Sequence, residues 1–149
     1  MKKLALLAAL PLVVGCGTPP PVSFGKLNGS TWHFTAIDGA APVGKTTNLR
    51  FDKGRIGANV GCNGMGADAK LIGGRIVAGP VISTQMYCEG VMEQERAVGA
   101  LLGAKPTMTV RETSMTLRGG GHSARLFAAD AEQARADLGW TAPPFEIPA

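Results

Sequence analysis

The sequence predicts an α+β fold that is mostly β, with about eight short antiparallel strands in a curled sheet or small barrel and one helix packed on it. Three observations lead to this prediction. Apolar and polar residues alternate with a period of two in short runs between Thr31 and Phe127. Hairpin-length connections separate these runs nearly throughout. A helical pattern of apolar residues stands out in one stretch, Glu89–Leu102. This order indicates an antiparallel sheet that curls over its core, with the helix covering an opening.

The strands are predicted from their alternation and from the turn residues between them. In the first run, Trp32 and Phe34 share one face, and the third run leads directly into Gly61. Gly73 and Gly74 suit the positive φ angles of a tight hairpin turn. The predicted strands, in chain order, are Thr31–Ile37, Thr47–Phe51, Arg55–Val60, Asp68–Ile72, Arg75–Ala78, Thr107–Arg111, Ser114–Arg118 and Ala124–Phe127.

The predicted helix carries one polar residue of special interest. Glu89 and Glu93 lie in its early turns, where the helix dipole favours acids, and Gly103 is a natural stop. Its apolar stripe consists of Val91, Val98, Leu101 and Leu102. Glu95 falls close to this stripe, so if it is buried it needs a partner such as an arginine or backbone amides. Glu95 is the best single candidate for a polar network or a ligand contact, and a structural role is favoured.

The start of the chain predicts export and lipid anchoring rather than folded structure. Two lysines are followed by Leu4–Val14, an apolar run that is too short to span a bilayer but has the length of a signal-peptide core. The run ends in Val13-Val14-Gly15-Cys16, which resembles a bacterial lipobox. Residues 1–15 are therefore predicted to be a lipoprotein signal peptide, with Cys16 as the lipidated residue. The alternative is an ordinary secretory signal in which Cys16 is incidental.

The remaining chain divides into three further segments. Residues 16–29 form the lipidated start and a proline-rich tether, which is stiff and extended. Residues 30–127 form the folded domain, and residues 128–149 form an acidic tail with prolines and aromatics that is either disordered or docked. Gly17 follows Cys16, which by general sorting rules favours the outer membrane, so the domain is expected in the periplasm and the membrane is contacted through the lipid.

Charge divides the exported chain into a basic domain and an acidic tail. The domain from Ser30 to Phe127 has 11 basic and 7 acidic side chains, and the tail from Ala128 has one basic and four acidic side chains. The two parts could pair with each other, or the domain could face anionic envelope polymers or lipid. No basic cluster is tight enough for a nucleic-acid patch, and export argues against one. Nucleic acid is therefore not expected as a partner.

Two cysteines remain once Cys16 is acylated. Cys62 and Cys88 form an even pair in an oxidising compartment, which predicts a structural disulfide. Redox activity is disfavoured because the pair has no Cys-x-x-Cys spacing and no neighbouring histidine in sequence. A metal site would need two more ligands, and His33 and His122 are each better explained as surface residues. No metal and no cofactor are therefore expected.

Two further motifs are better explained by structure than by chemistry. Residues 39–46 literally satisfy the P-loop pattern, but a strand rather than a helix follows them, so no nucleotide is expected. Ser83 and Thr84 lack the elbow and the base of a catalytic serine, and Thr84 is expected to bond backbone where the chain leaves the sheet for the helix. Asn63 beside Gly64 is expected to hold a tight turn.

Taken together, these segments resemble the META-domain family, the HslJ-like heat-shock lipoproteins of bacterial envelopes. The triplet Gly61-Cys62-Asn63 is the most recognisable match, and Ser83–Cys88 and Met92–Glu95 follow at compatible spacing. The residues carried over as family motif are Gly61, Cys62, Asn63, Thr84, Cys88 and Glu95. The resemblance covers residues 30–127. The chain departs from the family pattern at Ala67 and Ala69, where the family commonly places an aromatic residue.

The resemblance implies a small domain dominated by antiparallel strands, with no established enzymatic activity or cofactor. It also implies a role in heat shock and envelope stress. The chain is therefore expected to be a non-catalytic outer-membrane lipoprotein that acts by binding or scaffolding, for which an envelope protein would serve as partner. The alternative is a ligand-binding barrel or an inhibitor of an envelope enzyme. That alternative predicts an apolar cavity, or an exposed loop set around Gly64-Met65-Gly66 and residues 119–122.

Overall fold

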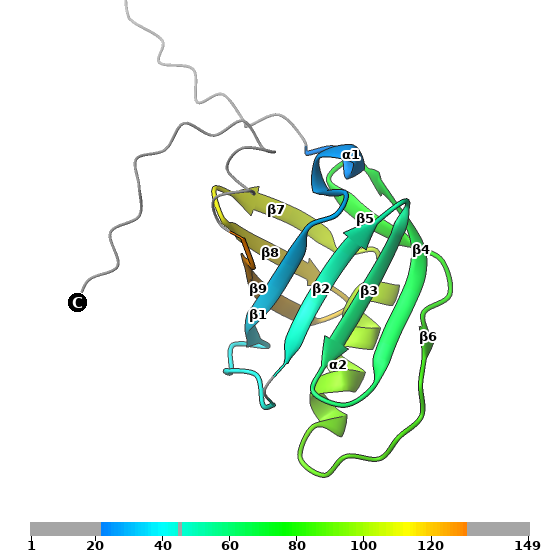
Figure 1. Cartoon of the computed structure of the whole chain (residues 1–149), viewed down its shortest axis with the longest axis vertical. Helices are drawn as coiled ribbons and strands as arrows, with labels where there is room; N and C mark the ends of the chain where they lie inside the picture. The colour runs from blue at the N-terminus through cyan, green and yellow to red at the C-terminus, as the bar shows by residue number, and fades with distance from the viewer. Residues whose placement is uncertain (1–21, 45, 131–149) are drawn as a thin grey trace, which may run out of the picture.

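The computed structural model describes residues 22–44 and 46–130. The predicted signal peptide, the predicted lipidation site at Cys16 and the tail from residue 131 lie outside these residues. In the described part, the elements in chain order are α1 (Phe24–Leu27), β1 (Thr31–Ile37), β2 (Thr47–Asp52), β3 (Arg55–Val60), β4 (Gly64–Ile72), β5 (Arg75–Ala78), β6 (Ile82–Ser83), α2 (Met92–Gly103), β7 (Thr107–Arg111), β8 (Ser114–Gly119) and β9 (His122–Ala128). Figure 1 shows their arrangement.

The strands close into an antiparallel barrel. The sheet runs in the order β3-β2-β1-β9-β8-β7-β5-β4, and β4 pairs with β3 to complete the ring. Hairpins join most neighbours, and β1 meets β9 across the length of the chain through pairs such as His33 with Phe127. The weakest joint is between β5 and β7, where a single residue pair, Arg75 with Thr107, is in register. The prediction of a small barrel is therefore confirmed, and the open curled sheet is not formed.

The period-two pattern decides which side chains fill the barrel. Residues that alternate along each strand point inward, and the largest side chains with almost no exposed surface are Trp32, Phe51, Leu49, Ile76, Met115, Leu117 and Leu126. These residues form one hydrophobic core cluster inside the barrel.

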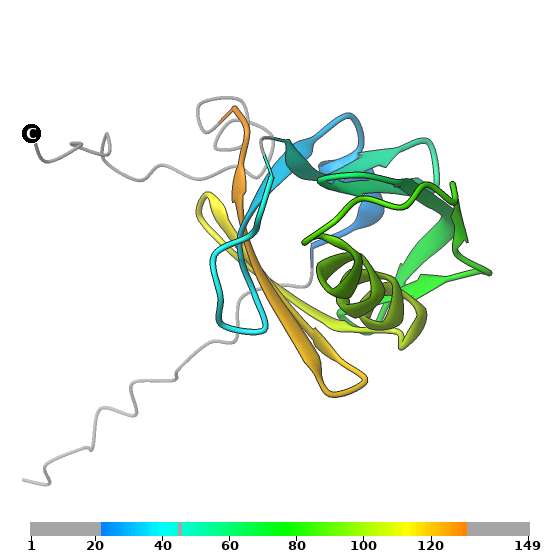
Figure 2. The ribbon, with the colours of Figure 1, turned by 90° about the horizontal axis from the view of Figure 1, so that it is seen from below.

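Helix α2 lies at one open end of the barrel, as the view in Figure 2 shows. It contacts strands on both sides of the opening, among them β3, β5, β8 and β9. The predicted stripe of Val91, Val98, Leu101 and Leu102 is buried. The helix begins at Met92 rather than at Glu89, because Gly90 adopts a φ of +80° and turns the chain before the first helical residue.

Strand β4 is longer than predicted, and its additional residues pair with β6, a short strand that the sequence did not predict. It begins at Gly64 rather than at Asp68, because Met65, Ala67 and Ala69 all point into the core. Its first half pairs with β3 and its last residues pair with β5. On the side where β5 has not yet begun, Met65 pairs with Ser83 of β6. The prediction of an exposed loop around Gly64-Met65-Gly66 is therefore wrong, since those residues belong to β4.

The folded part also begins before the predicted boundary at residue 30. Helix α1 lies on the barrel next to β2, and its last residue, Leu27, is buried in the core. The ring of Phe24 contacts the ring of Phe51 edge-on, with 5.7 Å between their centres. The residues just before β1 thus belong to the domain and not to the tether. No helix in the described ranges is long and apolar enough to cross a membrane.

Candidate functional site

Asn63, which lies between β3 and β4 in the chain, is the centre of a buried hydrogen-bond network. Its side-chain oxygen accepts hydrogen bonds from the backbone N–H of Met86 and the hydroxyl of Thr84, both at 2.8 Å. Its side-chain NH₂ donates to the carbonyl oxygen of Met86 at 2.9 Å and to Oε1 of Glu95 at 3.0 Å. The amide therefore makes the four hydrogen bonds that its chemistry allows. Asn63 thus links the barrel, the segment before α2 and α2 itself. The prediction of a tight turn at Asn63 and Gly64 is wrong, because neither residue has a positive φ and Gly64 already belongs to β4.

Glu95 lies on α2 with only 5% of its surface exposed. Its carboxylate accepts two hydrogen bonds from one residue, because Oε2 accepts from the backbone N–H of Asn63 at 3.0 Å and Oε1 from its side chain. Backbone and side-chain amides are thus the partners of this carboxylate, as the sequence analysis allowed. Both oxygens are engaged, which favours a structural carboxylate over a catalytic base.

Thr84 and the disulfide hold the segment between β6 and α2 in place. The hydroxyl of Thr84 accepts a hydrogen bond from the N–H of Gly64 at 3.2 Å, and its own N–H donates to the Gly64 carbonyl at 3.1 Å. The expected backbone contact of Thr84 is therefore present. Cys62 and Cys88 form a disulfide with 6.1 Å between their Cα atoms. The segment is tied to the barrel at its start, its middle and its end.

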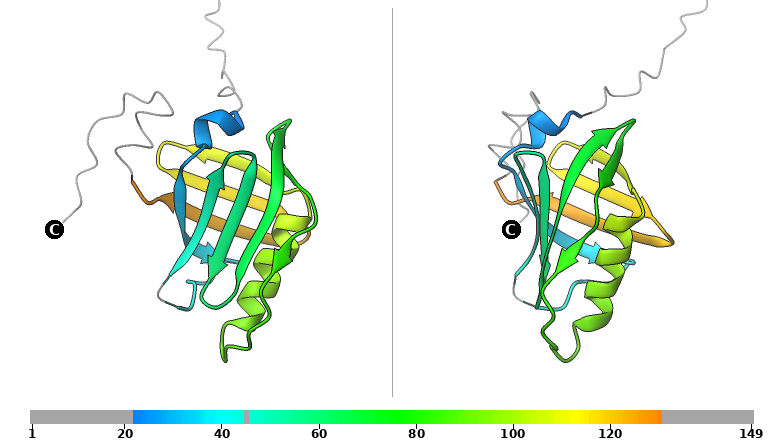
Figure 3. Two further views of the ribbon diagram at one scale, coloured as in Figure 1. Left: turned by 45° about the vertical axis from the view of Figure 1, so that its right-hand side comes forward. Right: turned by 90° about the vertical axis from the view of Figure 1, so that its right-hand side faces the viewer.

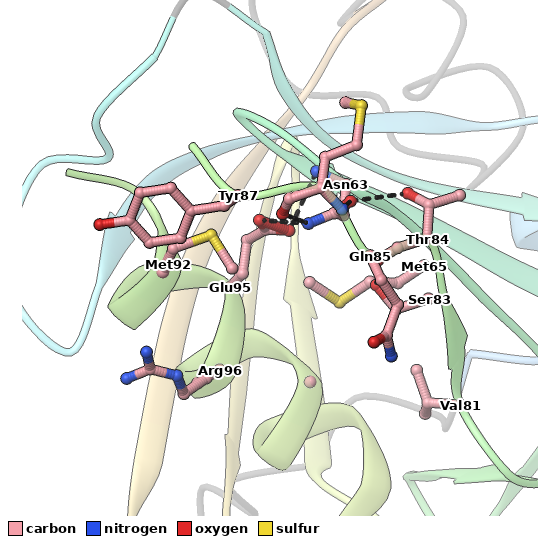
Figure 4. A pocket seen from close by; sticks show the side chains of 12 residues that line it. Asn63, Met65, Val81, Ser83, Thr84, Gln85, Tyr87, Met92, Glu95 and Arg96 are labelled. Carbon is pink, nitrogen blue, oxygen red and sulfur yellow. Dashed lines mark hydrogen bonds between the residues drawn. The ribbon is translucent and has the colours of Figure 1, made fainter. Parts of the chain in front are cut away.

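The tied segment and α2 enclose an open groove of about 530 Å³. Figure 4 shows Tyr87, Met92 and Arg96 along the helix side, with Ser83, Thr84 and Val81 on the opposite side. Asn63 and Glu95 form part of the lining, together with Met65, Gln85, Met86 and Gly99. Three methionines give the groove flexible apolar walls, a composition typical of surfaces that adapt to their partners. Of the family-motif residues, the groove contains Asn63, Thr84 and Glu95.

Large apolar side chains are exposed on β6 and on the tied segment that follows it. Tyr87 is 82% exposed, Ile82 is 74% exposed and Met86 is 59% exposed. Figure 3 shows this segment running beside α2 at the edge of the barrel. Neighbouring exposed apolar residues next to a groove are the usual mark of a contact surface. Such a surface can bind an apolar partner, and the groove offers room for its side chains.

The remaining candidate residues lie apart from the groove lining. His33 is exposed on β1, and Nδ1 of His122 lies 2.8 Å from Oδ2 of Asp38 near the surface. This contact is the main reason that the pKa of Asp38 lies below its ordinary value, and the hydrogen bond from the backbone N–H of Ser123 lowers it further. Within residues 22–44 and 46–130, no three His, Cys, Asp or Glu side chains are grouped so that they could hold a metal ion.

Sequence reasoning missed Tyr87, Met92, Arg96 and Gln94 as part of the site. The side chain of Gln94 accepts from the N–H of Val43 at 2.8 Å and donates to the carbonyl of Val60 at 2.7 Å, so it fixes the start of α2 to the barrel. The available signal was that Ser83–Cys88 and Met92–Glu95 both match the family pattern, since most of the groove lining comes from these two stretches.

Comparison with known proteins agrees with the fold. The META domain family model matches residues 25–132. One solved NMR structure of a protein superposes with a TM-score of 0.68 at 17% identity, covering 74% of this chain and 98% of that one. An NMR structure of a protein from Burkholderia xenovorans gives a TM-score of 0.57 at 17% identity, covering 82% and 99%. At this identity the two structures establish the fold alone, and no curated protein matches. On the family match, this chain belongs to the META domain family.

Proposed function

We propose that this chain is a non-catalytic, lipid-anchored protein of the bacterial outer membrane that supports tolerance of heat and envelope stress by binding another envelope protein. It is similar in this respect to the HslJ-like lipoproteins that its motifs resemble. The lipid on Cys16 holds the META domain in the periplasm. The groove between α2 and residues 81–87 is the binding surface.

The observation that carries this proposal is the exposure of Ile82, Met86 and Tyr87 beside the groove. These side chains are 59–82% exposed, and leaving such apolar surface in water costs free energy of roughly 25 cal/mol per Å². The segment that bears them is nevertheless fixed by the disulfide and by Asn63. A rigid wall lowers the entropy cost of binding, because the surface is already ordered before the partner arrives.

The partner that fits this surface is an extended polypeptide segment with apolar side chains. Strand β6 is the last strand of the sheet order and pairs only with β4 among the described strands. Its other edge is open to a further strand, which would gain backbone hydrogen bonds there. Alternate side chains of such a strand would meet the methionines of the groove. Arg96, which is exposed on the rim, suits an acidic residue in the partner.

Site-specific crosslinking in cells tests the binding surface. A photoreactive residue at Ile82 should crosslink to a defined envelope protein under heat stress, and Tyr87→Ser in the same chain should reduce that product several-fold. The same photoreactive residue at Phe127, which is 49% exposed on β9, provides the control. Equal products from positions 82 and 127, or no effect of Tyr87→Ser, would refute the groove as the binding surface.

A second test addresses the anchor and the role in stress. Cys16→Ala should release the chain from the membrane fraction and abolish complementation of a heat-sensitive deletion strain. Tyr87→Ser should leave the anchor intact and still reduce complementation, whereas Phe127→Ser should complement fully. Full complementation by Tyr87→Ser would separate stress tolerance from the groove.

Inhibition of an envelope enzyme remains the second candidate, because the same exposed segment could enter an enzyme cleft. Tyr87 is the most exposed large apolar side chain among the described residues, and it sits next to the disulfide, which gives the segment the stiffness that an inhibitory loop needs. A crosslink from position 82 into the active-site cleft of an enzyme would favour this candidate.

A further inference from the structure

A second hollow lies on the outer surface of the barrel, in addition to the groove. It has a volume of about 90 Å³. Its lining consists of Ala36, Gly39, Thr116, Arg118, Ser123, Ala124 and Arg125. Strands β8 and β9 supply the polar side chains, and the end of β1 with the loop after it supplies the small residues. The hollow therefore has room for several waters or one small ion.

The strand register brings the four polar side chains together. Thr116 on β8 pairs with Arg125 on β9, and Arg118 pairs with Ser123. Paired residues of antiparallel strands have Cβ atoms about 4.5–5.5 Å apart, and diagonal neighbours remain within reach of long side chains. The two arginines are diagonal neighbours, and the two hydroxyl residues occupy the other corners. The four residues thus occupy the corners of one square in the β8–β9 pairing, and all four line the hollow.

A bulge in β1 opens the space beside this square. The pairing of β1 with β9 shifts between Phe34 and Ala36, so one extra residue occupies β1 at this position. Bulges of this kind re-aim side chains and often occur next to functional sites. Ala36 and Gly39 then border the hollow with minimal side chains. A larger residue at either position would fill the hollow, so the space depends on this local sequence.

The charge of the hollow is positive. Among the described residues, no carboxylate lies within salt-bridge distance of Arg118 or Arg125, since the ion pairs found there are Arg55 with Asp68 and His122 with Asp38. Arg118 and Arg125 line the same hollow from diagonal positions of the β8–β9 pairing, and two positive charges around one space favour an anion there. Asp38 is a nearby acid, but its Oδ1 already accepts the N–H of Ser123 at 2.8 Å and its Oδ2 contacts His122. The positive charges therefore outnumber the negative one.

We propose that this hollow, between Arg118 and Arg125, binds one phosphate-class oxyanion. Guanidinium groups bind phosphate oxygens through two parallel N–H bonds, and the hydroxyls of Thr116 and Ser123 supply further donors. The volume of about 90 Å³ accepts a single tetrahedral anion. The phosphate belongs either to a free ion or to the headgroup of an anionic lipid. Both sources are available to a domain held at a membrane.

NMR titration of the full chain in uncharged detergent micelles tests the site. Sodium phosphate, exchanged for chloride at constant ionic strength, should cause saturable shifts in the backbone amides of Thr116, Arg118, Ser123 and Arg125. The double variant Arg118→Gln/Arg125→Gln should weaken binding at least tenfold. The matched control Arg50→Gln/Arg111→Gln removes the same charge from exposed positions on β2 and β7 and should change binding less than twofold. Dispersed amide spectra confirm that each variant folds.

The source of the phosphate is decided in lipid nanodiscs. If the ligand is a lipid headgroup, the same amides shift in nanodiscs of phosphatidylglycerol without added phosphate, and not in nanodiscs of phosphatidylcholine. If the ligand is free phosphate, they shift only when phosphate is added. Non-saturable shifts together with unchanged spectra in both nanodiscs would overturn the proposal, and so would equal weakening by the two double variants.

Discussion

Asn63 and Glu95, which are 32 residues apart in the chain, bind each other through two hydrogen bonds of 3.0 Å. Both amide groups of Asn63, one from the backbone and one from the side chain, donate to the same carboxylate. Because Asn63 is 2% exposed and Glu95 is 5% exposed, the pair is shielded from water. In such a buried environment each hydrogen bond is stronger than in water, and leaving one partner unpaired costs more free energy. This contact fixes α2 to the barrel and sets the position of one groove wall.

Removing either partner of this pair should destabilise the fold. Asn63→Ala and Glu95→Ala should each lower the free energy of unfolding by about 2–4 kcal/mol, because each leaves buried polar groups without partners. The double variant should cost less than the sum of the two, with a coupling of about 0.5–3 kcal/mol. Urea denaturation measures these values. Gln85→Ala, at an exposed position of the same segment, is the control and should lie within about 0.5 kcal/mol of the parent chain.

Gly61 should not tolerate a side chain, whereas Gly64 should. Gly61 has a φ of +109°, and a Cβ there would lie 3.1 Å from the Val43 carbonyl oxygen and 3.3 Å from Cγ1 of Val91. Gly61→Ala should therefore cost about 1–3 kcal/mol. Gly64→Ala should be neutral or stabilise by up to about 1 kcal/mol, because its φ is ordinary and no atom lies within 4 Å. Equal thermal-melt midpoints for the two variants would contradict this account.

Loss of the Cys62–Cys88 disulfide should destabilise the domain without abolishing its fold. In the chain-entropy model, a closed loop of about 27 residues contributes roughly 3.5 kcal/mol. Cys62→Ser/Cys88→Ser should therefore lower the free energy of unfolding by about 2–4 kcal/mol and increase hydrogen exchange in the segment between β6 and α2. Mass spectrometry with and without reductant checks the bond itself. Two free thiols in periplasmic material would refute it.

Asp38 should make stability depend on pH in the acid range. Its folded-state pKa is lowered mainly by His122, so it stabilises the fold above its unfolded pKa of about 3.9. That stability is lost as pH falls through the folded pKa. Asp38→Asn keeps a residue that tolerates the φ of +49°. It should lower the melting temperature at pH 7 and reduce the loss of stability below pH 4. Asp68→Asn, which removes an exposed ion pair with Arg55, serves as the charge-matched control.

The positions of most strands along the chain, the single long helix and its buried stripe follow from the sequence, because period-two and helical patterns indicate which face is buried. Positions such as Trp32, Leu49 and Leu126 were predictable for this reason. The Cys62–Cys88 pair was predictable by elimination. The start of α2 and the length of β4 were not predictable in the same way. The turn at Gly90 and the strand pairing of residues 64–67 depend on contacts with neighbouring elements, which the local pattern does not report.

The sequence by itself determined a mostly antiparallel fold, either a curled sheet or a small barrel, together with its family and the residues of the Gly61-Cys62-Asn63 motif, because these depend on local pattern and on spacing. Only the tertiary structure decided that the sheet closes and what Asn63 and Glu95 do, since their hydrogen bond joins residues that are 32 positions apart in the chain. The same holds for the groove and for the two arginines across the β8–β9 pairing. Such sites arise from register and packing, which bring distant residues together and leave no periodic signal in the chain.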